Sequence, residues 1–310
     1  MHTWGKEELE VYPTIKVFAF EVACRSFMSI DEPSQVKKLL ALFIVFLGGV
    51  FAIPINFPGT GFYYGKKAST AIKKELRIIV RQRKDALEQK TASPSQDLLS
   101  HLLVTPDECG KFMSESVIVN NILMLLFAGH DTSTSSITML INVLAEHPDV
   151  YEAVLREQNE IALSKQPGEF LEWEDIKKMR YSWSVVCETM RLLPPVLSSL
   201  REALMDINYG GWKIICSTHV THMDSSLFPD VTKFDPSRYD GVGPLPYSHI
   251  PFGGGPRMCP GKEFARLEML TFLHNVIRRF RWDLVIPGEK IIWDPMAKPE
   301  KGLPVRIHAH

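Results

Sequence analysis

Residues 251–261 read Pro-Phe-Gly-Gly-Gly-Pro-Arg-Met-Cys-Pro-Gly, and a long amphipathic segment follows them. This order predicts that Cys259 lies in a glycine-rich loop just before the N-terminus of a helix. The amides and the dipole at that end of a helix favour a thiolate over a thiol. The glycines let the backbone approach a flat ligand closely, because no Cβ stands in the way. The stretch predicts a metal ligand beside a planar group, and the alternative is a glycine-rich turn around a buried, inert cysteine.

Long helices are predicted on both sides of this loop. The segment Lys262 to Trp282 follows it and carries apolar residues along one broad face. The longest helical pattern begins at Ser114 and Glu115, which suit a cap and a first turn, and ends at His147 before a proline. Other helical patterns occupy 36–51, 66–89, 96–103, 148–165 and, as a pair, 173–193. Short strands and a meandering loop are predicted for 197–251, and hairpin strands after 283.

The composition is that of an ordinary globular protein, with 310 residues of which 45% are hydrophobic and 23% charged, and a net charge of -1. This balance gives no indication of a nucleic-acid partner. The basic patch from Lys73 to Lys84 is interpreted as a solvated helix face, with a headgroup-facing or partner-facing surface as the alternative. The five cysteines lie singly, which argues against a disulfide framework or a structural zinc site and indicates a reducing compartment.

A second unusual stretch, Ala128-Gly129-His130-Asp131-Thr132, lies in the middle of the longest predicted helix. A glycine there costs about 1 kcal/mol relative to alanine, so it needs a packing or a functional reason. Ala128 and Gly129 share a face with Thr132 and leave a groove beside the helix. An acid and an alcohol beside such a groove can hold water and relay protons to bound oxygen. Plain packing of the glycine is the alternative.

Together these stretches resemble the motifs of the cytochrome P-450 family. Residues 252–261 match every fixed position of its ligand loop, Phe-x-x-Gly-x-Arg-x-Cys-x-Gly. Residues 128–132 match its Ala-Gly-x-Asp-Thr oxygen-activation motif, and residues 188–191 match its Glu-x-x-Arg. The resemblance covers essentially the whole chain and is especially close to a plant branch that oxidises triterpenoids such as β-amyrin. It implies the mainly α cytochrome P-450 fold with small β-sheets.

The resemblance also implies roles for single residues. Cys259 would be the axial ligand of the iron of haem b, and Asp131 and Thr132 would be the catalytic residues of oxygen activation. Residues of the ligand loop, the long helix and a later loop would also bind haem: Arg257, Phe252, Gly253, Gly261, Ala128, Gly129 and Arg201. For Arg201 the alternative is a solvated loop arginine. Glu188, Arg191 and Arg238 would form a buried structural network, and His219 and His222 are interpreted as structural rather than as a metal pair.

The function implied is that of a haem-thiolate monooxygenase, which activates dioxygen and hydroxylates an apolar terpenoid, triterpenoid or sterol-like substrate. Electrons would come from NADPH through a cytochrome P-450 reductase. One alternative is a truncated, non-catalytic remnant that binds haem weakly or not at all. Another keeps haem but rearranges a peroxide; Asp131 and Thr132 argue against it, because that chemistry needs no proton relay to dioxygen.

The resemblance bears on location as well. The chain begins well inside the usual family sequence, so we expect residues 1–310 to be the C-terminal two-thirds of a single haem domain, without its anchor. The family's place would be the cytosolic face of the endoplasmic reticulum membrane. The apolar run Leu39 to Ile53 is short for a span of about 20 residues and predicts a buried or interfacial helix. With the residues up to Phe57, it would roof the substrate channel and touch the membrane surface.

Overall fold

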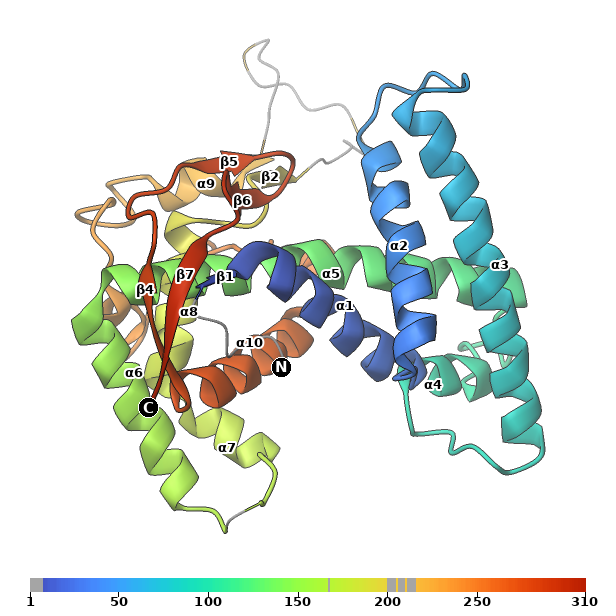
Figure 1. Cartoon of the computed structure of the whole chain (residues 1–310), viewed down its shortest axis with the longest axis horizontal. Helices are drawn as coiled ribbons and strands as arrows, with labels where there is room; N and C mark the ends of the chain where they lie inside the picture. Colours follow the sequence, from blue (N-terminus) through green and yellow to red (C-terminus); the bar gives the residue numbers. More distant parts are fainter. Residues whose placement is uncertain (1–7, 167, 200–204, 206–209, 211–215) are drawn as a thin grey trace. The chain divides into compact units, whose positions relative to one another are not determined.

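The computed structural model describes residues 8–166, 168–199, 205, 210 and 216–310 (Figure 1). The helices are α1 (Val11–Met28), α2 (Pro33–Val50), α3 (Gly61–Glu88), α4 (Leu98–Val104), α5 (Glu115–Glu146), α6 (Pro148–Leu163), α7 (Trp173–Lys178), α8 (Arg180–Leu192), α9 (Thr218–His222) and α10 (Lys262–Ile277). Short 3-10 turns are η1 (Pro236–Tyr239) and η2 (Gly255–Arg257). The strands are β1 (Glu8–Glu10), β2 (Ser198–Ser199), β3 (Cys216–Ser217), β4 (Phe280–Leu284), β5 (Ile291–Trp293), β6 (Ala297–Pro299) and β7 (Pro304–Ala309). The described chain is mainly α with small antiparallel sheets, as predicted.

The described chain falls into two compact units. We call residues 16–131 the hairpin unit and residues 1–15 together with 132–310 the ligand-loop unit. Helices α1 and α5 each contribute residues to both units. The predicted longest helix is confirmed as α5, which starts where the amides of Val117 and Ile118 donate to the carbonyl of Ser114. With 32 residues it is about 48 Å long.

The hairpin unit takes its name from α2 and α3, which pack against each other as two long antiparallel rods (Figure 1). Their backbones touch at two glycines, because a Cβ on Gly49 would lie only 2.6 Å from the Cα of Gly65. The Thr60 hydroxyl caps α3 by accepting the Tyr63 amide at 3.2 Å. Only glycine at both crossing positions allows this close approach.

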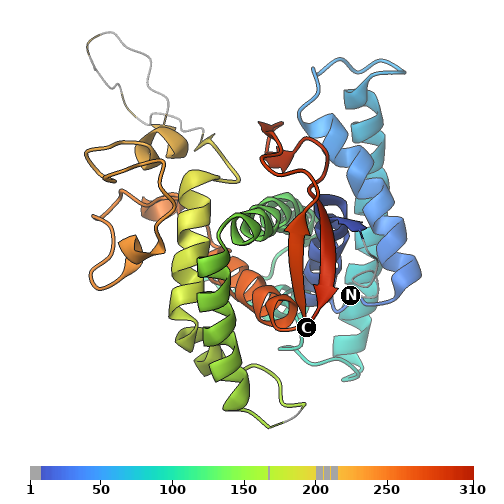
Figure 2. The ribbon, with the colours of Figure 1, turned by 60° about the vertical axis from the view of Figure 1, so that its left-hand side comes forward.

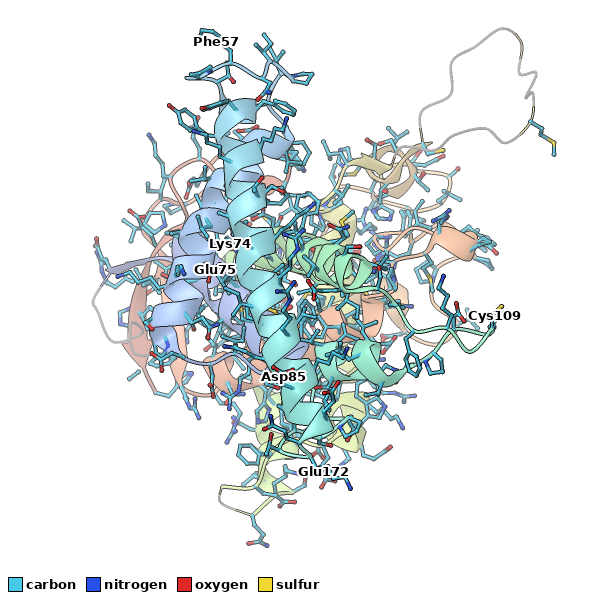
Figure 3. All side chains as sticks on the ribbon, turned by 90° about the vertical axis from the view of Figure 1, so that its right-hand side faces the viewer. Phe57, Lys74, Glu75, Asp85, Cys109 and Glu172 are labelled. Carbon is cyan, nitrogen blue, oxygen red and sulfur yellow. The ribbon has the colours of Figure 1, made fainter. Side chains whose placement is uncertain are left out.

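One face of α2 is buried, by Val36, Leu39, Phe43 and Leu47, and the opposite face is exposed. By length and composition alone, α2 is apolar enough to cross a membrane. The prediction of a buried or interfacial helix agrees with its one-sided burial. Beyond α2, exposed apolar side chains occupy the connection to α3: Phe51, Ile53, Ile55 and Phe57. Phe57 lies at the tip of the hairpin in Figure 3, and Lys74, Glu75 and Asp85 follow along α3.

The basic patch on α3 is mainly a solvated face, as predicted, with Lys74, Arg77, Arg81 and Lys84 exposed. Arg83 is the exception. Its guanidinium pairs with the buried Asp97 carboxylate and donates to the carbonyl of Met28 at 2.8 Å. Asp97 also caps α4 by accepting the Ser100 amide at 2.7 Å. This buried ion pair joins α1, α3 and α4 within the hairpin unit.

The ligand-loop unit contains a three-stranded antiparallel sheet in the order β1-β7-β4. Helices α6 and α8 pack against each other as neighbouring rods (Figure 2). Trp282 of β4 is buried and donates its indole N–H to the carbonyl of Ile141 on α5 at 3.0 Å. The Tyr151 hydroxyl of α6 donates to the carbonyl of Phe280 at 2.9 Å. These bonds fix β4 against two helices.

Two sequence predictions of secondary structure were wrong, one in the end of a helix and one in the type of element. The helix predicted for 262–282 ends at Ile277, and residues 280–284 form β4. Apolar spacing continues through this segment, but Phe280 and Trp282 favour a strand and pair with Ala309 and Ile307 of β7. The segment of His219 and His222 was predicted as strand or loop, yet it is the short helix α9, which the Ser217 hydroxyl caps by accepting the Val220 amide at 3.3 Å.

Candidate functional site

The ligand loop places Cys259 directly before α10, as predicted. Gly261 is the N-cap of that helix, and the Cys259 amide donates to the carbonyl of Phe252 at 2.9 Å, which closes the loop. Gly253 and Gly255 have φ values of 72° and 68°, a left-handed conformation that favours glycine. The Cys259 thiol is free and exposed. The Cys259 sulfur is therefore accessible to a ligand at the N-terminus of α10.

The residues present fit a flat, dianionic cofactor with a metal at its centre. A Cβ on Gly255 would meet no atom within 4 Å, and one on Gly261 would lie 3.7 Å from the Cys259 sulfur. The space beside the thiol is thus kept open on the glycine side. The Arg257 side chain is exposed and makes no hydrogen bond or ion pair within the described part of the chain, so its charge is available for a carboxylate. This donor set suits haem, whose iron takes a thiolate and whose edge carries two propionates.

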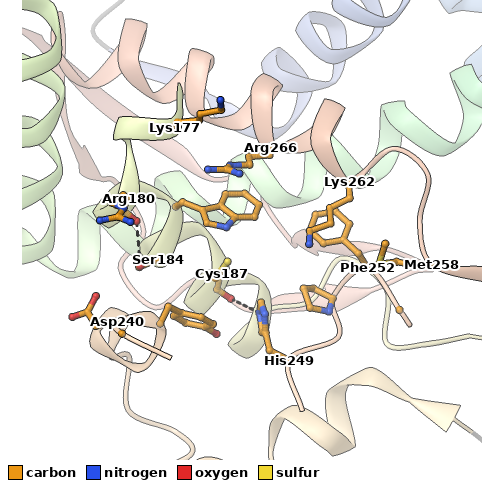
Figure 4. A pocket seen from close by; sticks show the side chains of 15 residues that line it. Lys177, Arg180, Ser184, Cys187, Asp240, His249, Phe252, Met258, Lys262 and Arg266 are labelled. Atoms are coloured by element: carbon orange, nitrogen blue, oxygen red, sulfur yellow. Dashed lines mark hydrogen bonds between the residues drawn. The ribbon is translucent and has the colours of Figure 1, made fainter. Parts of the chain in front are cut away.

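Below the loop, a cavity of about 730 Å³ opens among α7, α8, the start of α10 and the loop itself (Figure 4). Phe252, Gly253 and Met258 of the ligand loop form part of its wall. Four cationic side chains line it, Lys177, Arg180, Lys262 and Arg266, against one carboxylate, Asp240. The guanidinium of Arg266 lies over the ring of Trp183, 5.2 Å from its centroid. The cavity presents positive charge next to the ligand loop.

The predicted network of Glu188, Arg191 and Arg238 is confirmed. The buried carboxylate of Glu188 accepts from Arg191 Nε at 2.7 Å and from Arg238 Nε at 3.2 Å. It also accepts the Asp235 amide at 3.0 Å and the Tyr239 hydroxyl at 3.2 Å. Arg191, which is fully buried, extends the network to the carbonyls of His222 and Lys233 at 3.0 and 3.2 Å. The pair thus ties α8 to the segment that leads into the ligand loop.

Two histidines, His222 and His249, support the segment that leads into the loop. Only His222 was singled out from the sequence. Its Nε2 accepts the amide of Ile250, one residue before the loop, at 2.9 Å. Its ring stacks on His249 with centroids 5.4 Å apart, and His249 Nε2 lies 3.1 Å from the carbonyl of Cys187. Burial lowers the pKa of His222 to about 3 and that of His249 to about 4, so both rings are neutral. The structural interpretation of His222 is therefore confirmed.

The acid of the second motif is held inside the hairpin unit. Asp131 Oδ1 lies 3.4 Å from Lys16 Nζ of α1 and 3.1 Å from His130 Nδ1. His130 is fully buried and its Nε2 lies 3.0 Å from the carbonyl of Lys16. Burial alone would raise the pKa of Asp131, but His130 and the charge of Lys16 outweigh it and lower the pKa. Asp131 is therefore a carboxylate at neutral pH, with an ammonium group at hand. Spacing gave no signal for Lys16, which lies 115 residues away in the sequence.

For the other predicted site residues, the structure gives only their exposure and local packing. Thr132 is half-buried and Ala128 is exposed. A Cβ on Gly129 would meet the Phe27 ring at 3.8 Å, which is ordinary contact, so an alanine would fit within the hairpin unit. Arg201 lies outside the described residues, and its contact with a propionate stays a prediction.

Comparisons with known proteins give matches over nearly the whole chain. The family model for cytochrome P-450 matches residues 11–303. A β-amyrin 28-monooxygenase of Kalopanax septemlobus is 52% identical over 312 residues, which is 99% of this chain and 65% of that protein. A β-amyrin 16-beta-monooxygenase of Platycodon grandiflorus is 46% identical over 318 residues, 99% of this chain and 66% of that protein. A solved structure of a retinoic-acid-bound cyanobacterial cytochrome P-450 has a TM-score of 0.88 and 35% identity, and the match covers 100% of this chain and 72% of that one.

These matches test the resemblance that the motifs suggested. The chain spans about 65% of the length of the curated relative from Kalopanax septemlobus. The similarity to the solved structure, over the whole of this chain, confirms the predicted mainly α fold with small sheets. The family match includes the ligand loop, residues 128–132 and the buried network of α8. This chain belongs to the cytochrome P-450 family.

Proposed function

We propose that the protein is a haem-thiolate monooxygenase that hydroxylates a triterpenoid. The observation that carries the proposal is the exposed thiol of Cys259 at the start of α10, in a glycine loop with a free arginine two residues before it. A cysteine that served only for packing would be buried, as Cys24 and Cys187 are.

The chain's own residues would hold the cofactor as follows. Cys259 would ligate the iron, the backbone of Gly253 and Gly261 would approach the porphyrin, and Arg257 would pair with a propionate. When bound, haem supplies the iron on which dioxygen is reduced and cleaved. Phe252, from the same loop, would pack against the ring. The dipole of α10 would stabilise the negative charge on sulfur.

Residues of α5 would supply protons. The Thr132 hydroxyl would donate a proton toward the oxygen side of the cofactor, and Asp131 would take part in replacing it. Lys16 Nζ lies 3.4 Å from Asp131 Oδ1, and this ion pair would pass on a proton that arrives from solvent. Ala128 and Gly129 have small side chains one turn earlier and would leave room for oxygen and water. General acid assistance of this kind typically contributes about 10²–10⁴-fold.

The substrate class comes from the relatives, which are named as a β-amyrin 28-monooxygenase and a β-amyrin 16-beta-monooxygenase. Electrons would come from NADPH through a cytochrome P-450 reductase. The cavity beside the ligand loop is a suitable place for such a donor, because four cations line it and would attract an acidic surface.

We further propose that the protein acts at the cytosolic face of the endoplasmic reticulum membrane. The exposed apolar side chains between α2 and α3 support contact with the membrane surface, since four of them lie within seven residues: Phe51, Ile53, Ile55 and Phe57. Exposed patches of this kind mark sites of interaction. Lys66 and Lys67, at the start of α3, add positive charge beside this patch.

Expression with a plant reductase tests the function directly. The purified protein should show the carbon monoxide difference spectrum of a thiolate ligand and convert β-amyrin to a hydroxylated product with NADPH. The Cys259→Ser variant should lose that spectrum, whereas Cys109→Ser and Cys216→Ser, which change the other exposed thiols, should keep it. A thiolate spectrum in Cys259→Ser would refute the assignment. A spectrum without turnover of any triterpenoid would favour the non-catalytic alternative.

A further inference from the structure

Glu268 is a buried carboxyl group that the proposed reaction does not use. It lies on α10, nine residues after Cys259, and is 7% exposed. Its Oε2 accepts the hydroxyl of Ser133 at 2.6 Å, across 135 residues of sequence. Ser133 is 5% exposed and is its only hydrogen-bond partner among the residues that the structure describes. This short bond joins α10 to α5.

The bond lies between the two helices that carry or follow predicted site residues. Helix α10 begins three residues after Cys259, and Ser133 directly follows Thr132 on α5. Glu268 thus connects the helix behind the thiolate with the helix that carries the oxygen-activation threonine. Both partners belong to the ligand-loop unit.

A second bond on α5 fixes its rotation. The Ser135 hydroxyl donates to the carbonyl of Ala297 in β6 at 2.7 Å. Residues two apart on a helix point about 200° from each other, so Ser133 and Ser135 anchor nearly opposite sides of α5. Thr132 lies about 100° from Ser133 around the same axis. With both anchors in place, the direction of the Thr132 side chain is set.

The surroundings of Glu268 offer no substitute for its hydrogen bond to Ser133. Burial raises the pKa of Glu268 to about 7, and the Ser133 hydroxyl opposes that rise. Helix α10 packs against α6, α7, α8 and β4 and is joined to α5 by the Ser133 bond, and no charged group on any of these elements contributes to the shift of the Glu268 pKa in the described structure. The carboxyl group has no ionic partner to replace Ser133 if that bond is lost.

We propose that Glu268 is a positioning residue, whose bond to Ser133 sets the spacing and rotation of α5 relative to the ligand helix and so aims Thr132 at oxygen. The inference rests on the proposed haem-thiolate function. Without the bond, α5 would keep its fold but gain rotational freedom at Thr132. Electrons would then be lost to peroxide and water instead of product.

The haem-loaded protein with reductase, NADPH and β-amyrin as the probe substrate tests this. Ser133→Ala and Glu268→Leu should keep the thiolate spectrum but lower the product formed per NADPH on the order of tenfold. This loss is smaller than the roughly hundredfold loss of rate that a 1 Å misplacement of a reacting group costs. Ser133→Thr and Glu268→Gln, which retain the donor and the acceptor, should restore most of it. The double variant should lose no more than either single one, because both remove the same bond.

A matched control lies five residues along the same helix. Thr138 is fully buried, and its hydroxyl donates to its own helix at the carbonyl of Thr134, 2.7 Å away. Thr138→Val should therefore leave the yield per NADPH unchanged. An unchanged yield in Ser133→Ala, or additive losses in the double variant, would overturn the proposal. Absence of a thiolate spectrum from the unaltered protein would instead refute the proposed function.

Discussion

Replacing Glu188 by glutamine should destabilise this protein far more than the loss of an ordinary surface ion pair at positions i and i+3 of a helix would. Glu188 and Arg191 are both fully buried, and Arg191 donates to both carboxylate oxygens, at 2.7 and 2.8 Å. Glutamine keeps the shape but leaves the guanidinium without a counter-charge. Breaking a buried pair in this way costs about 3–5 kcal/mol. That is a large share of the roughly 5–15 kcal/mol by which folded proteins are stable.

A matched control is available on α7. Glu174 and Lys177 have the same i, i+3 spacing and a contact of 2.6 Å, but their side chains are 70% and 51% exposed. An exposed pair contributes about 0–1 kcal/mol, so Glu174→Gln should change the free energy of unfolding by less than that. Urea unfolding followed by circular dichroism measures both variants. Equal, small losses in the two would show that burial of the Glu188 pair does not determine its energy.

Three further results are expected. Thr132→Ala should still bind haem and β-amyrin but form much less product per NADPH; unchanged coupling there and in Asp131→Asn would return the motif to a packing role. Glu268→Gln should alter the pH dependence of stability. In the folded protein the pKa of Glu268 is raised from 4.5 to about 7, so the native carboxyl group keeps its proton where the unfolded one has lost it. The free energy of unfolding therefore falls by about 3 kcal/mol as the pH rises from 4.5 to about 7, and the variant should lack this fall. Parallel urea curves at pH 5 and pH 8 would contradict this. Gly49→Ala should destabilise the protein by about 1–3 kcal/mol, because its Cβ meets the backbone of Gly65, whereas Gly48→Ala, with open space, should be neutral or stabilising.

Local patterns predicted the elements around the site well. Ser114, Glu115 and Pro148 marked the limits of α5, because caps and breakers act within a few residues. Cys259 was correctly placed before α10 for the same reason. The end of α10 was missed, since apolar spacing alone does not separate a helix from a strand whose partner lies elsewhere in the chain.

Long-range partners were harder to predict. Arg238 was found only because the family places an arginine there, and its contact with Glu188 joins residues 50 apart. Lys16 beside Asp131 and Ser133 beside Glu268 carry no local signature, because a lone lysine or serine on a helix normally faces solvent. Such pairs are set by how helices pack, and sequence spacing within one helix does not contain that information.

The glycine crossing of α2 and α3 has a mechanical consequence. The clamp at Gly49 and Gly65 lies next to the apolar connection, so the two rods cannot slide past each other at that end. At the opposite end, Ser29 and Lys90 adopt left-handed backbone angles, with φ of 52° and 59°. The Ser29 hydroxyl also donates to the buried Asp97 carboxylate at 2.6 Å, so the pair of helices is held at both ends and would resist bending as one stiff unit. Helix α2 is about 27 Å long, so this unit would hold Phe57 at a fixed distance from Ser29.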